Sequence, residues 1–173
     1  NSKTLACVTT AKGTGAISSI RVAGPSAGVI IKNIFKPISG GQADFKIGDI
    51  LTGNILDGPR VIDQVVIGCE GKNNFEINCH GNPIIIEIIM KLLKSHKAQL
   101  VAAEQMLAQQ LSGHDVSNAI ATEAKLAQLT AVTLEGVKII ANQARLGLGK
   151  IASGWLQNME RLKLHDIARQ CEQ

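Results

Sequence analysis

The stretch 75–83 (Phe-Glu-Ile-Asn-Cys-His-Gly-Asn-Pro), with the apolar run 84–93 after it, most constrains how this chain can fold. Its first residues alternate between apolar and polar, which is the period-two pattern of a strand. Gly81 permits a sharp bend, Asn82 suits a helix N-cap, and Pro83 suits the first helical turn. The sequence therefore predicts a strand, a tight polar turn and a helix. A carboxylate, an amide, a thiol and an imidazole gather around that turn.

Similar patterns predict the other elements of an α+β fold. Strands are expected at 4–9, 16–23, 45–56, 61–69, 75–79 and 98–102, and helices at 26–35, 83–95 and 103–111. Glycines within 45–56, Gly48 and Gly53, mark possible bulges.

Strand patterns stop after the polar segment 112–118, which we take as a domain boundary. Beyond it, apolar residues at three-and-four spacing predict one long helix over 119–150, which Gly147 and Gly149 interrupt near its end, and a last helix over 151–171. The predicted layout is a mixed-sheet domain, residues 1–115, followed by a helical segment of two α-helices, residues 116–173. Two helices alone bury little apolar surface, so we expect them to pack on the first domain or on a second copy of the chain.

Composition narrows the class of protein. The 173 residues are 45% hydrophobic, which allows a packed core, but only 2% aromatic, which leaves few rings on which single-stranded RNA could stack. The net charge of +4 permits a polyanionic partner without requiring one.

Cysteine usage and hydropathy indicate the compartment. None of the four cysteines forms a CxxC pair, so zinc-ribbon and thioredoxin-like classes are excluded. The N-terminus carries no signal-peptide pattern, and the run 84–93 is too short to cross a bilayer. We expect a cytoplasmic protein with reduced thiols and no membrane contact.

Three segments together resemble a known family. The Gly-rich loop 10–15 leads into Ile-Arg-Val-Ala-Gly at 20–24, Val-Ile-Asp-Gln-Val-Val follows at 61–66, and Phe-Glu-Ile-Asn-Cys-His-Gly at 75–81 comes last. In this order and spacing they resemble the N-terminal domain of the MnmE (TrmE) tRNA modification GTPases. A fourth segment, Thr-Glu-Ala-Lys-Leu-Ala-Gln-Leu at 122–129, resembles a helix of the same family.

The resemblance implies a fold and a role. It implies a folate-binding domain like that of the glycine-cleavage aminomethyltransferases, which binds formyl-tetrahydrofolate and mediates homodimerisation. The one-carbon unit would serve modification of the wobble uridine of tRNA. The implied partners are a second copy of the chain and an MnmG-type flavoprotein. Because the net charge is modest, we expect tRNA to be contacted only indirectly, through a partner.

Three residues are candidates for binding the cofactor. The resemblance places a pterin- or folate-contacting arginine at Arg21, and a structural alternative is an internal ion pair with Glu76. It places a folate-binding carboxylate at Glu76, whose two oxygens match the donor edge of a pterin; here the alternative is a solvent-facing strand residue. His80 is expected to shape the turn and line the pocket. Cys79 and His80 should point to opposite faces of their strand, so we expect neither a metal site nor a catalytic nucleophile.

Several departures from the family bear on function. The sequence has no phosphate-binding GxxxxGK(S/T) motif, since Lys12–Gly15 joins two strands and Gly147–Ile151 lacks the hydroxyl that holds magnesium. The family's Cys-x-Gly-Lys ending is absent, and residues 105–114 replace the segment that carries a folate-contacting lysine. His114 lies nearest to that lysine, and the role is not carried over to it.

These departures leave three interpretations open. The first is a truncated or divergent folate-binding module for tRNA modification, with no GTP hydrolysis by this chain alone; whether it is an enzyme stays open. The second is a folate-free dimerisation or adaptor module. The third is a fragment of a full-length GTPase.

Overall fold

The computed structural model describes residues 3–11, 13–112, 119–128, 130–157 and 169. The chain divides into two compact units, Asn1–Met106 and Leu107–Gln173. The predicted boundary between residues 115 and 116 falls within 113–118, outside the described residues, and stays a prediction. No described helix combines the length and the apolar character needed to cross a membrane.

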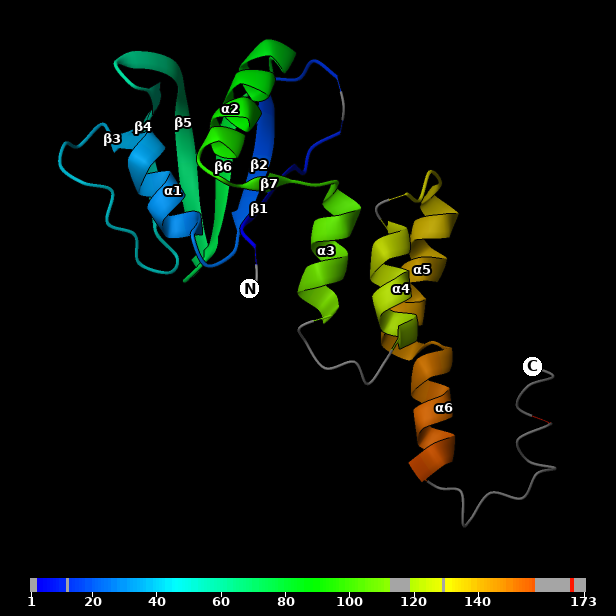
Figure 1. Cartoon of the computed structure of the whole chain (residues 1–173). Helices are drawn as coiled ribbons and strands as arrows, with labels where there is room; N and C mark the ends of the chain where they lie inside the picture. Colours follow the sequence, from blue (N-terminus) through cyan, green and yellow to red (C-terminus); the bar gives the residue numbers. More distant parts are fainter. Residues whose placement is uncertain (1–2, 12, 113–118, 129, 158–168, 170–173) are drawn as a thin grey trace. The chain divides into compact units, whose positions relative to one another are not determined.

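The first unit is built on one seven-stranded mixed sheet (Figure 1). Its elements are β1 Leu5–Val8, β2 Ile17–Ala23, α1 Ala27–Ile34, β3 Phe35–Pro37, β4 Ile50–Asp57, β5 Arg60–Gly71, β6 Asn74–His80, α2 Pro83–Ser95, β7 Gln99–Leu100 and the start of α3 Ala103–Ser112. The strand order is β3-β4-β5-β6-β2-β1-β7, with β1 and β7 parallel and every other neighbouring pair antiparallel. The predicted α+β class with a mixed sheet is confirmed.

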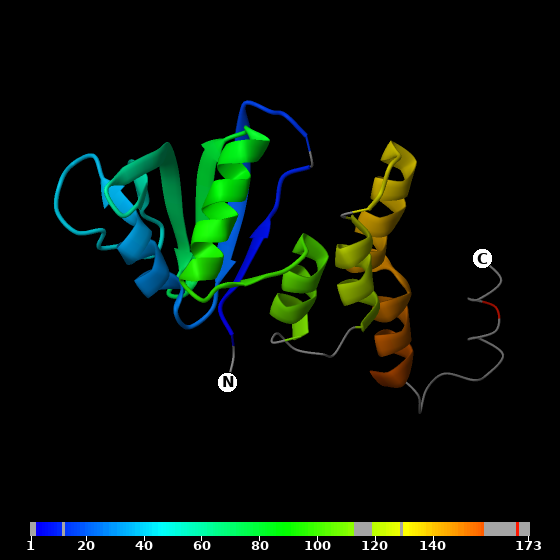
Figure 2. The same cartoon turned by 45° about the horizontal axis from the view of Figure 1, so that its top comes forward.

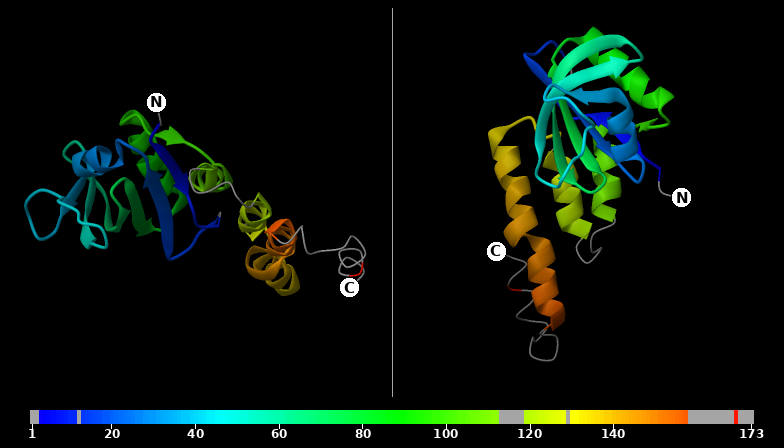
Figure 3. Two further views of the ribbon diagram at one scale, coloured as in Figure 1. Left: turned by 90° about the horizontal axis from the view of Figure 1, so that it is seen from below. Right: turned by 90° about the vertical axis from the view of Figure 1, so that its left-hand side faces the viewer.

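Helices α1 and α2 cover one face of this sheet, as Figure 2 and the left view of Figure 3 show. The core between them is formed by alternate strand residues such as Ile20, Val22 and Ile77, packed with Ile31 of α1 and Leu93 of α2. Because strand side chains alternate between faces, the residues between these core positions project from the other face. The predicted site residues Arg21 and Glu76 belong to that second face.

The turn between β6 and α2 forms as the sequence predicts. The Asn82 Oδ1 atom accepts a hydrogen bond from the Ile84 amide at 2.9 Å, and Pro83 starts the helix. Gly81 N donates to Ala16 O, and Gly15 N donates to Gly81 O, both at 3.1 Å. A side chain at Gly81 would overlap the carbonyl oxygen of Gly15. Glycine thus lets the 13–16 loop lie directly against this turn.

The edge of the sheet near β3 departs from expectation. The sequence predicted no strand at Phe35–Pro37, yet β3 pairs there with Gly53–Ile55 of β4. Local patterns give little signal for a strand of three residues that follows a helix directly. The register irregularity of β4 lies at Ile55/Leu56, and not at the predicted Gly48 and Gly53.

The second unit contains α4 Ala119–Gln128, α5 Leu134–Leu146 and α6 Leu148–Gln157. The prediction of one long helix over 119–150, interrupted only near its end at Gly147 and Gly149, is wrong between α4 and α5, while α5 does end before Gly147. Thr133 adopts an extended backbone, and its Oγ1 atom accepts a hydrogen bond from the Gly136 amide at 3.0 Å, so a new helix begins there. The predicted last helix, 151–171, is described as α6 up to Gln157, and 158–168 lie outside the described residues.

Candidate functional site

Arg21 and Glu76 meet across two neighbouring strands. They are directly paired in the register of β2 and β6, so both side chains leave the same face. Arg21 Nη2 donates to Glu76 Oε2 at 2.5 Å and to Glu70 Oε1, at the end of β5, at 3.1 Å. The structure brings these two residues together, in the ion pair that was the structural alternative to folate contact. Glu70 is a further member that the sequence did not single out.

The charges of this cluster support each other. Partial burial of Glu76 alone would raise its pKa, but the hydrogen bond and charge of Arg21 outweigh burial, so the pKa of Glu76 lies below its ordinary value. Burial likewise disfavours the charged form of Arg21. The hydrogen bond to Glu76 and the charge of Glu70 outweigh it and raise the pKa of the guanidinium. Both groups are charged at neutral pH.

Two polar atoms beside this pair have no partner. Among the described side chains, Arg21 Nε and Asn74 Oδ1 are buried without a hydrogen bond, although Asn74 Nδ2 donates to Glu70 Oε2 at 3.0 Å. Buried polar groups are nearly always paired, so each unpaired one calls for an explanation. One is a donor and the other an acceptor, and both lie in the network around Glu76. Protein atoms cover both of them, so a ligand that supplies an acceptor and a donor would reach them only after the surrounding side chains move.

Space for such a ligand lies over the neighbouring strand. Gly68 of β5 pairs with Glu76, and a Cβ atom added at Gly68 would meet no atom within 4 Å. The glycine keeps the surface beside the carboxylate open. The Glu76 carboxylate, with the Arg21 guanidinium bonded to it, therefore lies next to open space and offers acceptors to the donor edge of a pterin ring.

Polar side chains continue along β6 from Glu76 through Asn78 to His80, and together with Arg21 they form what we call the polar row. Ser19 Oγ donates to Asn78 Oδ1 at 2.6 Å, which joins β2 to β6 midway. His80 lies four residues beyond Glu76, roughly 13 Å along the strand, and shares no contact with Arg21 or Glu76. The structure thus brings two of the three predicted residues together and places the third at the far end of the row.

His80 is held by a buried carboxylate. Its Nδ1 atom lies 2.6 Å from Asp63 Oδ1, and its backbone amide donates to Asp63 Oδ2 at 2.9 Å. The Asp63 side chain is 7% exposed, whereas the imidazole is 67% exposed. An ionised carboxylate only accepts hydrogen bonds, so Nδ1 carries the proton and Nε2 is left for other partners. Asp63 orients His80, a role that the sequence analysis did not assign to it.

Cys79 and His80 face opposite sides of β6. Cys79 is 2% exposed in the core, and its Sγ atom donates to Ser18 O at 3.5 Å. Burial, with a smaller contribution from the charge of Asp63, raises the pKa of Cys79 to about 11. The thiol is therefore protonated at neutral pH and turned away from the imidazole.

Comparison with known proteins places these features in a family. Residues 4–105, more than half of the chain, match the family described as GTP-binding protein TrmE N-terminus. A tRNA modification GTPase MnmE of Bacteroides thetaiotaomicron is 37% identical over 102 residues, 54% of this chain and 22% of that protein. One of Clostridioides difficile is 33% identical over 108 residues, 58% of this chain and 24% of that protein.

The matched region contains the whole polar row from Arg21 to His80 and ends before segment 122–129. The chain spans about a quarter or less of the length of these curated relatives. By its sequence match and its mixed sheet, the chain belongs to the TrmE N-terminus family.

Proposed function

We propose that the first unit binds a reduced folate, formyl-tetrahydrofolate, and serves tRNA modification at the wobble uridine. The observation that carries the proposal is the Glu76 carboxylate, paired with Arg21, beside the open surface over Gly68. Membership in a family whose curated relatives are named tRNA modification GTPases supports the tRNA part of the proposal. When bound, the folate would supply the one-carbon unit.

The protein's own residues would bind and orient this cofactor. Glu76 accepts hydrogen bonds from the pterin N–H groups. Once the covering side chains have moved, Arg21 Nε donates to a pterin acceptor and Asn74 Oδ1 accepts from a pterin amino group. Glu70 already shares the Arg21 guanidinium, so it competes with the ligand for that group. His80, held by Asp63, offers Nε2 to a more distant part of the folate, because the molecule is long enough to extend along β6.

Partners follow from the family. We propose that the chain forms a homodimer, that it works with an MnmG-type flavoprotein in the cytoplasm, and that tRNA is contacted through that partner. The sequence shown contains no phosphate-binding motif for GTP. GTP hydrolysis is therefore not proposed for these residues.

Calorimetric titration of the chain with formyl-tetrahydrofolate tests the binding. Arg21→Ala and Glu76→Ala should each weaken affinity by about ten- to a hundredfold, since each removes one charge-assisted contact. Glu87→Ala is the matched control, because it also removes a carboxylate from an ion pair, with Lys91 on α2. Equal affinity in the wild type and both site variants would contradict the proposal.

A second candidate is a dimerisation module that holds no folate. It is favoured by the observation that Arg21 and Glu76 already neutralise each other. It predicts a dimer by sedimentation and no heat of folate binding. A monomer at micromolar concentration would exclude this second candidate.

A further inference from the structure

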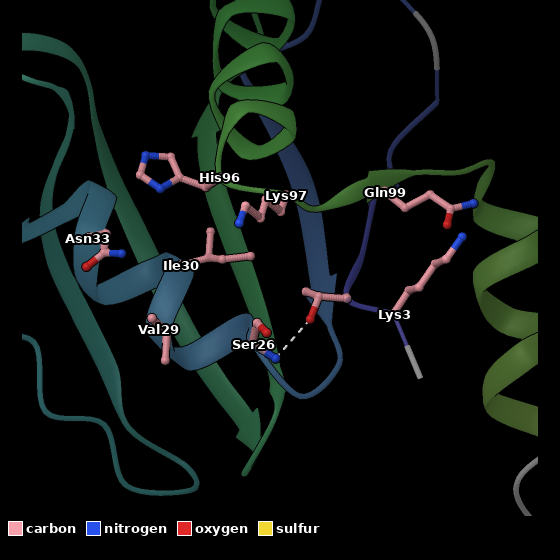
Figure 4. Close-up of a pocket in the computed structure, with 9 residues that line it drawn as sticks. Lys3, Ser26, Val29, Ile30, Asn33, His96, Lys97 and Gln99 are labelled. Carbon is pink, nitrogen blue, oxygen red and sulfur yellow. Dashed lines mark hydrogen bonds between the residues drawn. The ribbon is translucent and has the colours of Figure 1, made fainter. Parts of the chain in front are cut away.

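A cavity of about 390 Å³ lies between α1 and the segment that follows α2 (Figure 4). It is lined by residues of the helix-covered side of the first unit, and it includes none of Arg21, Glu76 and His80. Its volume is within the range of small-molecule sites in proteins. The cavity is thus a second place where this unit could hold a ligand.

The lining carries basic groups and no carboxylate. Lys3, His96 and Lys97 all contribute to it, and no acidic residue does. Within the described part of the chain, no carboxylate lies within ion-pair distance of these three side chains. Lysines that line a concave surface without acidic partners create a positive potential, which attracts anions.

Lys97 occupies a position where the fold itself favours glycine. Its φ of 71° is the only positive φ of a non-glycine residue among those described. Its amide donates to Lys94 O at 2.9 Å, and the Ala98 amide donates to Leu93 O at 3.0 Å, which ends α2. Glycine usually fills this left-handed position, because it avoids the strain that a side chain brings. Lys97 adopts this conformation despite the strain, and residues in such conformations often serve function.

The last carbonyl groups of α2 accept hydrogen bonds from backbone amides, and among the described residues none of these bonds comes from the Lys97 ammonium group. The carbonyls of Leu92, Leu93 and Lys94 already accept hydrogen bonds from the backbone amides of residues 96–98. Within the described part of the chain, no ion pair engages the Lys97 ammonium group, and the residue is exposed, so the group stays available to a ligand.

The opposite wall of the cavity is apolar with one amide. Val29 is 63% exposed, next to the buried Ile30, and Asn33 completes this side of α1. Figure 4 shows these α1 residues on one side of the cavity and His96 and Lys97 on the other. A ligand that fits both walls has an anionic group and a small apolar body.

We propose that this cavity binds a small molecule that carries a phosphate or carboxylate group, with Lys97 contacting the anion and Val29 contacting the apolar part. This proposal is independent of folate binding, because it uses other residues on the other side of the sheet.

Titration of the full chain with inorganic pyrophosphate and, separately, with citrate tests the proposal. The readout is the NMR shift of the His96 side chain and of the Lys97 and Val29 backbone amides. We expect saturable binding of at least one probe at millimolar concentration or below, and the two arms distinguish phosphate from carboxylate chemistry. Failure of both probes to saturate these shifts overturns the proposal.

Two variants and one control sharpen the test. Lys97→Gly should weaken binding about tenfold while the protein stays at least as stable, because glycine suits the backbone there. Val29→Asp should abolish binding, although an aspartate in the first turn of α1 favours the helix. Lys94→Ala removes an equal charge from the last turn of α2, outside the cavity, and should bind as the wild type does. Equal weakening by Lys97→Gly and Lys94→Ala would overturn the assignment to this cavity.

Discussion

Asp63 is a buried carboxylate whose two oxygens serve the same histidine. One oxygen faces His80 Nδ1 and also accepts the Gln64 amide at 2.9 Å, and the other accepts the His80 amide. This arrangement fixes the orientation and the tautomer of an imidazole that is itself mostly exposed. At the residue scale, the position of Nε2 therefore depends on a side chain that never reaches the surface.

Asp63→Asn should disturb this histidine more than the rest of the fold. Asparagine offers one acceptor oxygen where aspartate offers two, so a buried donor loses its partner at a cost of about 1–3 kcal/mol in unfolding free energy. Nitrogen-15 NMR of His80 should show a loss of the Nδ1-protonated tautomer. Asp57→Asn, at an exposed residue that ends β4, is the control. An unchanged tautomer in Asp63→Asn would show that the carboxylate does not set it.

The sequence predicted Arg21 and Glu76 as site residues but gave Asp63 and Glu70 no role. The first two stand on strands whose pairing aligns them directly, and a family resemblance named both. The contact of Asp63 with His80 joins residues 17 positions apart on β5 and β6, and Glu70 meets Arg21 across 49 positions. Such contacts depend on strand order, which local periodicity does not contain. The sequence did offer one sign of a role for Asp63, because a carboxylate is unusual within a largely apolar strand such as 61–69.

The turn between β6 and α2 packs closely against the 13–16 loop at Gly81. Gly81→Ala should lower the unfolding free energy by about 2 kcal/mol or more, because the new methyl group overlaps backbone atoms of Gly15 and must push the 13–16 loop away. Urea unfolding followed by circular dichroism measures the change. Gly68→Ala is a matched control on β5, where the added carbon meets open space, so stability should stay equal or rise by up to about 1 kcal/mol.

Elements whose ends carry clear capping or helix-breaking residues could be predicted from the sequence, and the others could not. Helix α2 begins and ends at the predicted residues, because Asn82 and Pro83 mark its start and the apolar stripe is long. The region 119–150 keeps helical spacing through the break before Thr133, so periodicity alone joined α4 to α5. In that region Thr133 caps and starts a new helix, and the three-and-four spacing of apolar residues carries no information about caps.

For the whole molecule, the Arg21–Glu76 pair links the stability of the first unit to pH. The pKa of Glu76 is lowered in the folded state from its ordinary value of 4.5, so the unfolded chain takes up this proton first as the pH falls. The stabilisation is complete well above pH 4.5 and is lost as the pH falls through the lower folded value.

Urea unfolding at a series of pH values measures this loss, and Glu76→Gln should show a shallower decline in acid than the wild type. Because Trp155 is the only tryptophan, its fluorescence follows the second unit, while circular dichroism reports both units. An identical acid profile in the wild type and Glu76→Gln would exclude the linkage.

The place of β1 in the sheet also governs how this unit can assemble during synthesis. Among the described strands of this sheet, β1 comes first in the sequence and lies between β2 and β7, and β7 comes last. Its parallel partner Gln99 thus arrives more than 90 residues after Leu5. A pairing of such long range is slow to form, because loop closure must come before its contacts. The nascent sheet keeps one side of β1 unpaired until nearly the whole unit has been translated, an interval in which binding by a chaperone would protect that edge from aggregation.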